Sequence, residues 1–404
     1  AILINWTREL DFYEKIIEKF DTNQISLIVN DIKTNEIERK NNTLSIIESL
    51  KRKKKDFYLF SEVYKNLKFN VIISTGLSCP KKITFYSVVK FFYAQSFGSF
   101  LNLLRLSKYL NKFLKKDITG GGQKTSYYEE WFPEKKLGET TIFFPRGFDL
   151  RLKHFPNKKF KNVFDIFLCY GEFDKQLIQQ KFNNKNNFII GYPKYDISVD
   201  LDETKKKIYR EFDLDPQKKI IFWCPTYIEE KNEISENIKI WLRKISNLKK
   251  HFNIIIRPHP KNIVVDQDLK KTILNEGLYL DGLTDRKLIE LYSSADLILL
   301  DYGASVMTSI YLEKNMALLE LPSNFKFIEK LEKNKSLDSE IRREISKKNI
   351  LSLDNNSLLA PINDLIFQSN LSNILLLKKK YFGNNKNSNL NFLVDKLKKK
   401  LKYD

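Results

Sequence analysis

Short β-branched and aromatic runs recur along this chain and are separated by longer stretches with helical spacing. In the first half these runs lie at residues 25–31, 69–75, 140–145, 165–171 and 187–193. In the second half they lie at residues 219–226, 252–258, 277–282, 296–303 and 316–322. Alternating strands and helices are typical of parallel sheets whose strands are buried on both faces. The pattern therefore predicts an α/β protein with two parallel sheets.

The boundary between the two sheets is expected near residue 198. Residues 194–219 carry turn and charged residues and contain no strand-like run, which is typical of a connection between domains. The chain has 404 residues and 42% hydrophobic content, enough for two cores. We predict a Rossmann-like domain over 1–198, a second over 199–385, and a separate terminal segment over 386–404.

The terminal segment has the pattern of a basic amphipathic helix. Leu390, Leu393, Leu397 and Leu401 follow one another at spacings of three and four, with lysines between them. Two interpretations stay open. The leucines pack on the body of the protein, or they lie on an anionic membrane surface.

The charge balance favours an anionic partner. The chain has 70 Lys and Arg against 50 Asp and Glu, a formal net charge of +20. Such an excess favours phospholipid or a polyanionic product, although solvated surface lysines are the plainer interpretation. The sequence has no zinc-finger, RNP-type or basic-zipper pattern, so a nucleic-acid partner is not expected.

Cysteine usage and hydropathy indicate a cytoplasmic protein. Cys79, Cys169 and Cys224 are widely spaced in apolar stretches without a CxxC pair, which is typical of buried thiols in a reducing compartment. The apolar start is too short for a signal peptide, and no run reaches about 20 apolar residues. We expect a cytoplasmic location, with peripheral attachment to the inner face of the membrane as an alternative.

One strand end in the second half carries an arginine and one of the three histidines. Three isoleucines at 254–256 are followed by Arg257, Pro258 and His259. Because proline cannot continue the ladder, Arg257 and His259 should lie at the carboxyl end of the strand, where open sheets bind ligands. The alternative is that His259 only caps a loop by bonding a backbone carbonyl. A guanidinium beside an imidazole suits a phosphate or diphosphate.

A second strand end has the form of a phosphate-binding turn. The buried run "DLILLD" ends at Asp301, and the turn Gly303-Ala304-Ser305 follows before a helix. Backbone N–H groups, a helix N-terminus and the Ser305 hydroxyl can together hold a phosphate. An ordinary turn capped by a serine is the alternative. Together the two strand ends indicate a nucleotide-donor site.

Five segments, in their order and spacing, resemble the CDP-glycerol glycerophosphotransferase family of wall and capsule polymer enzymes. They are "IIGYPKYD" (189–196), "KKIIFWCPTY" (218–227), "IIIRPHP" (254–260), "DLILLDYGAS" (296–305) and "YLEKNMALLELP" (311–322). The resemblance covers roughly residues 165–325. It implies a GT-B fold, in which two Rossmann-like domains enclose a cleft.

The resemblance also implies an activity and a set of donor-site residues. The enzyme would transfer a polyol phosphate, glycerol- or ribitol-phosphate, from a CDP-activated donor to a hydroxyl of a surface polymer or glycolipid. The implied donor contacts are His259 and Ser305, with Arg257, Thr226, Asp301 and Gly303 nearby. Such transfer depends mainly on positioning and on neutralising the diphosphate. We therefore expect neither a cofactor nor a metal.

The acceptor half departs from the family pattern. The family carries a His-Gly in its first domain, thought to act on the acceptor hydroxyl, whereas the two comparable segments here read "FPRGFD" (144–149) and "AQSFGS" (94–99). Arg146 cannot accept a proton at neutral pH, so it is expected to hold an anionic group. Asp149 is the preferred general base and His154 the alternative.

Two other functions stay open at this point. One is a GT-B glycosyltransferase that uses a CMP- or UDP-sugar in capsule or lipopolysaccharide synthesis. The other is a catalytically silent GT-B module that binds nucleotide or polymer. Fold alone does not separate these functions.

Overall fold

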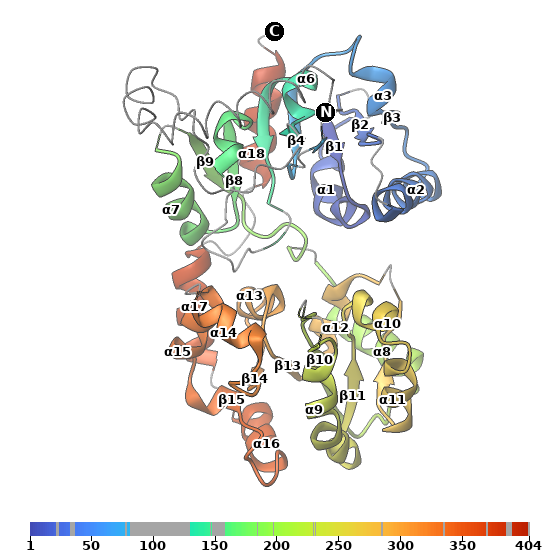
Figure 1. Ribbon diagram of the computed structural model, residues 1–404, viewed down its shortest axis with the longest axis vertical. Helices are drawn as coiled ribbons and strands as arrows, with labels where there is room; N and C mark the ends of the chain where they lie inside the picture. Colours follow the sequence, from blue (N-terminus) through green and yellow to red (C-terminus); the bar gives the residue numbers. More distant parts are fainter. Residues whose placement is uncertain are drawn as a thin grey trace, which may run out of the picture. The chain divides into compact units, whose positions relative to one another are not determined.

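The computed structural model describes most of both predicted halves of the chain (Figure 1). The described residues are 1–21, 24–32, 37–76, 79–80, 130–145, 147, 158–183, 185–196, 198–228, 230, 232–283, 286–333, 336–368, 371–384 and 390–402. Contacts divide the chain into two compact units, residues 1–10 with 21–143 and residues 11–20 with 144–404.

The first sheet has seven strands in the order β3-β2-β1-β4-β7-β8-β9. Their bounds are β1 Ile2–Ile4, β2 Leu27–Val29, β3 Tyr58–Leu59, β4 Phe69–Ser74, β7 Gly138–Phe143, β8 Ile166–Cys169 and β9 Asn186–Ile189. All five strand-like runs predicted for the first half contain a strand. Sequence patterns missed β1, whose three buried residues pair in parallel with both β2 and β4. A strand this short carries too little pattern to be recognised.

Helices and one small antiparallel strand pair accompany this sheet. The helices are η1 Thr7–Glu9, α1 Leu10–Ile17, α2 Ile37–Arg52, α3 Phe60–Val63, α6 Glu134–Leu137, η2 Lys158–Asn162 and α7 Glu172–Lys181. The antiparallel pair is β5 Cys79–Pro80 with β6 Glu130–Trp131. In the first unit, Leu3 of β1 packs with Ile28, Ile72 and Leu137 in one apolar cluster.

The second sheet has six strands in the order β12-β11-β10-β13-β14-β15. Their bounds are β10 Lys219–Cys224, β11 Phe252–Ile256, β12 Tyr279–Leu280, β13 Leu297–Leu300, β14 Met316–Leu319 and β15 Ile350–Leu351. All of these pairings are parallel. The five runs predicted for the second half each contain a strand, whereas the two-residue β15 was missed.

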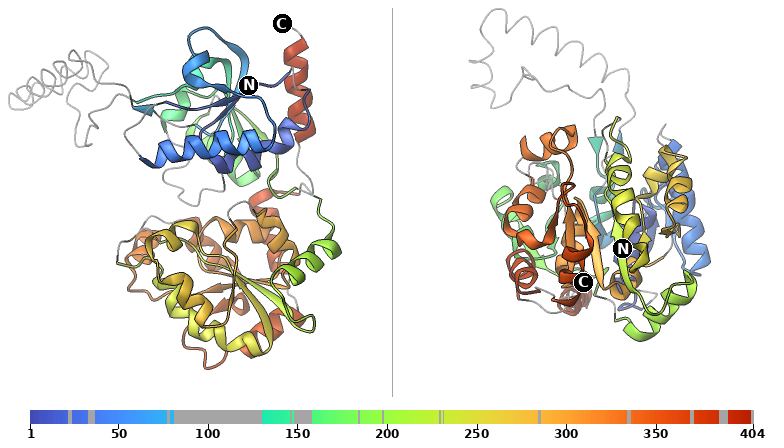
Figure 2. Two further views of the ribbon diagram at one scale, coloured as in Figure 1. Left: turned by 90° about the vertical axis from the view of Figure 1, so that its right-hand side faces the viewer. Right: turned by 90° about the horizontal axis from the view of Figure 1, so that it is seen from below.

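Helices cover both faces of the second sheet (Figure 2). They are α8 Leu201–Glu211, α9 Glu236–Ser246, η3 Asn247–Lys250, α10 Pro260–Val265, α11 Leu269–Asn275, α12 Leu288–Ser294, α13 Ala304–Tyr311, α14 Lys326–Lys333, α15 Leu337–Glu344, η4 Lys347–Asn349, α16 Leu359–Phe367 and α17 Leu371–Phe382. Successive residues of β10 face opposite sides: Trp223 clusters with Trp241 of α9, and Phe222 packs edge-on against Tyr292 of α12. The α/β prediction is confirmed. The boundary near residue 198 stays a prediction.

The terminal helix α18, Leu390–Lys402, buries its leucine stripe. Leu390, Leu393 and Leu397 are 2%, 4% and 7% exposed. Its polar side reaches the segment after α1, where Lys19 Nζ donates to Asn391 Oδ1 at 2.5 Å. The three leucines therefore pack on the protein, and the interpretation that places them on a membrane is wrong for them, because their side chains are already covered by the protein. The side chain of Leu401 lies outside the described residues.

Within the described part of the chain, no helix combines the length and the apolar character needed to cross a bilayer.

Candidate functional site

Three adjacent parallel strands end together at one edge of the second sheet. β10 pairs with β11 on one side and with β13 on the other, with Trp223 opposite Ile256 and Leu299. The loops that follow these strands carry Thr226, Arg257 with His259, and Asp301 with Gly303 and Ser305. The structure thus brings all six predicted donor-site residues to the same carboxyl edge.

Asp301 is a buried brace between two of these loops. Its Oδ1 accepts the backbone N–H groups of Thr226 at 2.8 Å and Tyr302 at 2.7 Å. Its Oδ2 accepts from the Asn237 side-chain amide at 2.6 Å. Burial raises the pKa of Asp301, and these three donors work against that rise. Since both carboxylate oxygens are occupied, Asp301 positions the edge of the site.

The turn after β13 requires glycine at residue 303. Gly303 has φ of +91°, and a Cβ built there would lie 2.9 Å from Thr226 Oγ1. Its N–H donates to Oδ1 of Asp338 at 3.0 Å. Burial raises the pKa of Asp338 to about 6. Close packing between the β10 and β13 loops therefore fixes this turn.

Ser305 lies in the first turn of α13, half-buried. The N-cap of α13 is Gly303, and no side chain caps the helix, so the alternative of a serine-capped turn is wrong. Ser305 instead lies beside the Cys224 thiol. Burial, and then the neighbouring Asp301, raise the pKa of Cys224 to about 12, against hydrogen bonding from Ser305. Cys224 is therefore a neutral thiol and no nucleophile.

An ion network behind the site holds Arg257. Its Nη1 donates to Asp281 Oδ2 at 2.5 Å, and the Asp281 side chain is fully buried. Arg286 Nε donates to the other Asp281 oxygen at 3.0 Å, and Arg286 also pairs with Glu211. Sequence reasoning missed Asp281, although it directly follows β12 at the same sheet edge. This network fixes the guanidinium plane and leaves further Arg257 N–H groups to face a ligand.

His259 caps α10 and presents its ring beside an aromatic side chain. Its Nδ1 accepts the backbone N–H of Lys261 at 3.2 Å. The ring centre lies 5.5 Å from that of Tyr227. His259 therefore caps the start of a helix by accepting a backbone N–H, whereas the alternative expected a bond to a backbone carbonyl in a loop. A neutral imidazole whose Nδ1 accepts carries its proton on Nε2, which makes Nε2 a donor.

The groups of this edge that face solvent are hydrogen-bond donors. Asp281, Asp301 and Asp338 are buried, whereas Arg257 and His259 are partly exposed. Among the described residues, no group of three or more His, Cys, Asp or Glu side chains is arranged to hold a metal ion. The arrangement can bind an anion through N–H and O–H donors.

The residues predicted for acceptor chemistry cannot be placed in this geometry. Arg146, Asp149 and His154 lie outside the described residues, as does the "AQSFGS" segment. Their roles stay predictions.

A family model matches the part of the chain that holds this site. The CDP-Glycerol:Poly(glycerophosphate) glycerophosphotransferase model matches residues 147–314. The predicted family resemblance is confirmed. The matched stretch contains all six donor-site residues and the two base candidates, Asp149 and His154, and it supports the predicted enzyme class, a transferase. None of the curated proteins matches the chain.

Solved structures agree with the predicted fold. The wall teichoic acid polymerase TagF is 14% identical with a TM-score of 0.57, covering 100% of this chain and 89% of TagF. A TagF variant soaked with CDPG is 13% identical with a TM-score of 0.56, covering 100% and 89%. The UDP-GlcNAc 2-epimerase from Neisseria meningitidis, bound to UDP-GlcNAc, is 13% identical with a TM-score of 0.50, covering 98% and 99%. The GT-B fold is therefore confirmed.

Proposed function

We propose that this chain transfers glycerol phosphate from CDP-glycerol to a hydroxyl of a cell-wall or capsule polymer. The observation that carries the proposal is the set of hydrogen-bond donors at the ends of β10, β11 and β13, which lies wholly within the segment matched by the glycerophosphotransferase family. The CDPG-soaked TagF variant, which shares the fold, supports a CDP-activated donor.

The donor diphosphate is bound by groups whose orientation is already set. Arg257, held from behind by Asp281, directs its remaining N–H groups to the phosphates. His259 donates through Nε2, and the Ser305 hydroxyl donates after turning from the Cys224 thiol to the ligand. Preorganised donors of this kind neutralise charge that grows in the transition state without reorganising at that moment.

The reaction forms one P–O bond and breaks another. An acceptor hydroxyl oxygen attacks the phosphorus of the glycerol phosphate group, and the bond to the CMP oxygen breaks. The electron pair of that bond leaves with CMP, whose charge is stabilised by Arg257 and His259. The hydroxyl proton passes to a general base, for which we propose Asp149, with His154 as the alternative. Arg146 would hold an anionic group of donor or acceptor.

The location of the reaction is proposed from charge. A formal net charge of +20 suits work beside anionic polymer or phospholipid. We propose a cytoplasmic protein that meets its acceptor, a polymer or glycolipid, at the inner face of the membrane. The buried leucines of α18 do not contribute to that contact.

Two substitutions test the donor site. Arg257→Ala and His259→Ala should each weaken CDP-glycerol binding by about 10- to 100-fold, because each removes a charged or strong donor worth roughly 1.5–3 kcal/mol. Calorimetry measures affinity, and mass spectrometry of the product measures transfer. Matched controls are Arg243→Ala on α9 and His251→Ala before β11, both exposed and away from the site.

The outcomes separate the candidate functions. Loss of binding in both site variants, with normal binding in the controls, supports the proposal. Unchanged affinity in both site variants would show that the donor lies elsewhere. CDP-glycerol binding by the native protein without transfer to any polymer acceptor would favour the silent binding module.

A further inference from the structure

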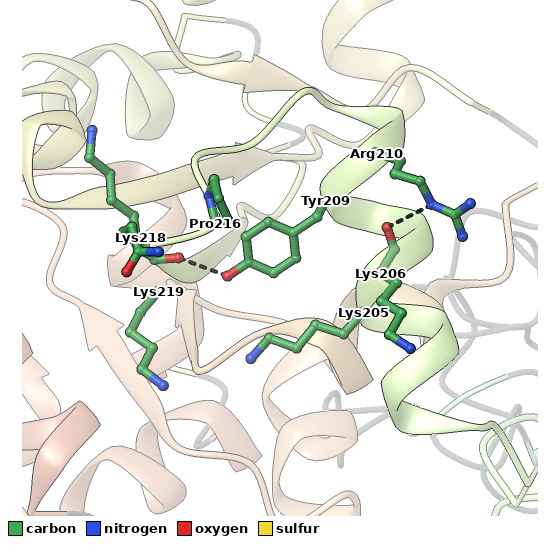
Figure 3. A pocket seen from close by; sticks show the side chains of 8 residues that line it. Lys205, Lys206, Tyr209, Arg210, Pro216, Lys218 and Lys219 are labelled. Carbon is green, nitrogen blue, oxygen red and sulfur yellow. Dashed lines mark hydrogen bonds between the residues drawn. The ribbon is translucent and has the colours of Figure 1, made fainter.

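A basic hollow lies at the sheet edge opposite the donor site (Figure 3). It has a volume of about 630 Å³. We define it by the six side chains that give it its character: Lys205, Lys206, Tyr209, Arg210, Lys218 and Lys219. None of the described lining residues carries a carboxylate. Nothing in the donor-site chemistry requires this hollow.

Two neighbouring segments build the basic hollow. Lys205, Lys206 and Arg210 come from α8, whereas Lys218 and Lys219 lie where β10 begins. The Tyr209 hydroxyl donates to the Lys218 carbonyl at 2.7 Å and joins the two segments. In Figure 3 the ring of Tyr209 lies between them, and Lys205 and Lys219 extend to the same side of it.

The charges of the basic hollow are only partly neutralised. Asp296 pairs with Lys205 at 3.0 Å and with Lys219 at 3.8 Å. Asp215 pairs with Lys218 at 3.6 Å. Five cationic side chains therefore face two carboxylates, which leaves three positive charges in excess.

Lys206 and Arg210 carry two of these three excess charges, and the third is shared by Lys205 and Lys219, which pair with the same Asp296. Both side chains are exposed, and neither has an acidic partner among the described residues. Arg210 Nε donates to the Lys206 carbonyl at 3.4 Å, so the two residues lie one helical turn apart on α8. A guanidinium and an ammonium on the same helix face can each contact a different phosphate.

The size and lining of the hollow indicate the kind of anion. Its volume falls within the roughly 300–1,000 Å³ of sites that hold whole small molecules, so it exceeds the needs of a single bound phosphate. Exposed lysines can attract an anionic bilayer by charge alone, but firm attachment would add apolar side chains that insert among the lipids. The described lining offers only Pro216 and the Tyr209 ring for that purpose. A chain with repeating phosphate groups fits better than a membrane surface.

We propose that the basic hollow binds a polyanion with repeating phosphodiester groups. The proposal rests on the charge and shape of the hollow and needs no assumption about transfer. β10 runs from the hollow at Lys219 to the donor-site edge at Cys224, and its length is about 17 Å at about 3.3 Å per residue. If the proposed function holds, the acceptor polymer is the ligand, and its capture there raises its effective concentration at the reacting edge.

The test uses inorganic polyphosphate of defined length and the full chain. Binding to the native protein should weaken as salt rises, because exposed charges are screened. The double variant Lys206→Ala/Arg210→Ala should bind at least tenfold more weakly. The matched control, Lys270→Ala/Lys271→Ala on α11, removes two exposed positive charges elsewhere and should bind within twofold of the native protein.

Each remaining outcome overturns the proposal. Equal affinity in native protein and double variant would show that the hollow does not bind the polyanion. Equal weakening in the double variant and the control would assign binding to net charge. If the double variant binds phosphatidylserine vesicles more weakly than the native protein does but binds polyphosphate equally well, the hollow contacts a membrane instead.

The affinity of the same double variant for CDP-glycerol should stay unchanged. That measurement separates this test from the test of the donor site.

Discussion

Asp338 gives the turn after β13 a pH dependence that can be measured as stability. Its carboxylate is buried and accepts the Gly303 N–H. Burial raises its pKa from 3.8 to about 6, and the Gly303 and Arg342 contacts offset only part of that rise. At about 1.36 kcal/mol for each pH unit, the difference corresponds to about 3 kcal/mol.

Proton binding sets the direction in which the free energy of unfolding changes with pH. Because the pKa is higher in the folded state, the folded protein binds more protons between pH 4 and 6 than the unfolded chain does. The charged carboxylate therefore lowers the free energy of unfolding by about 3 kcal/mol at pH 7.5, and by only about 1 kcal/mol at pH 4.5. The penalty is relieved as the pH falls.

The variant Asp338→Asn removes this titration and keeps an oxygen for the Gly303 N–H. Urea unfolding at pH 7.5 and at pH 4.5 gives, at each pH, the difference in unfolding free energy between the variant and the native protein. Between pH 7.5 and pH 4.5, the unfolding free energy of the variant should fall by about 2 kcal/mol relative to that of the native protein. Any fixed cost of burying the amide is the same at both pH values and cancels. A difference that stays constant within about 0.5 kcal/mol would refute the reasoning, and NMR titration of the Asp338 carboxyl carbon provides an independent check.

Two further predictions concern packing. Gly303→Ala should lower the free energy of unfolding by about 1–3 kcal/mol, because φ is +91° and the new Cβ would meet Thr226 Oγ1. The control Gly282→Ala, whose Cβ would have nothing within 4 Å, should change this free energy by less than about 0.5 kcal/mol. Thermal unfolding compares the two variants, and equal effects would contradict the conclusion that close packing fixes the turn at Gly303. Leu393→Ala on α18 should cost about 2–4 kcal/mol and leave vesicle binding unchanged, because this leucine is buried. A variant that stays stable but loses vesicle binding would show that the leucine stripe contacts the membrane.

Local sequence was sufficient to predict the strands that carry the candidate donor-site residues. The isoleucine run before Arg257 and the run before Asp301 are typical of buried parallel strands, and a proline and a glycine mark where each ends. Parallel strands end at one edge, so residues far apart in the chain were predicted to meet there. The same reasoning could not find β1, because three apolar residues carry no measurable period.

The sequence by itself determined the α/β class, the two sheets and the residues at the ends of β10, β11 and β13. Only the tertiary structure decided which side chains support them, because Asp281, Arg286 and Asp338 act through space and show no local pattern. It also decided between the two interpretations of the terminal leucines. An amphipathic stripe indicates that something covers it, but burial of Leu390, Leu393 and Leu397 depends on which surface the fold places opposite α18.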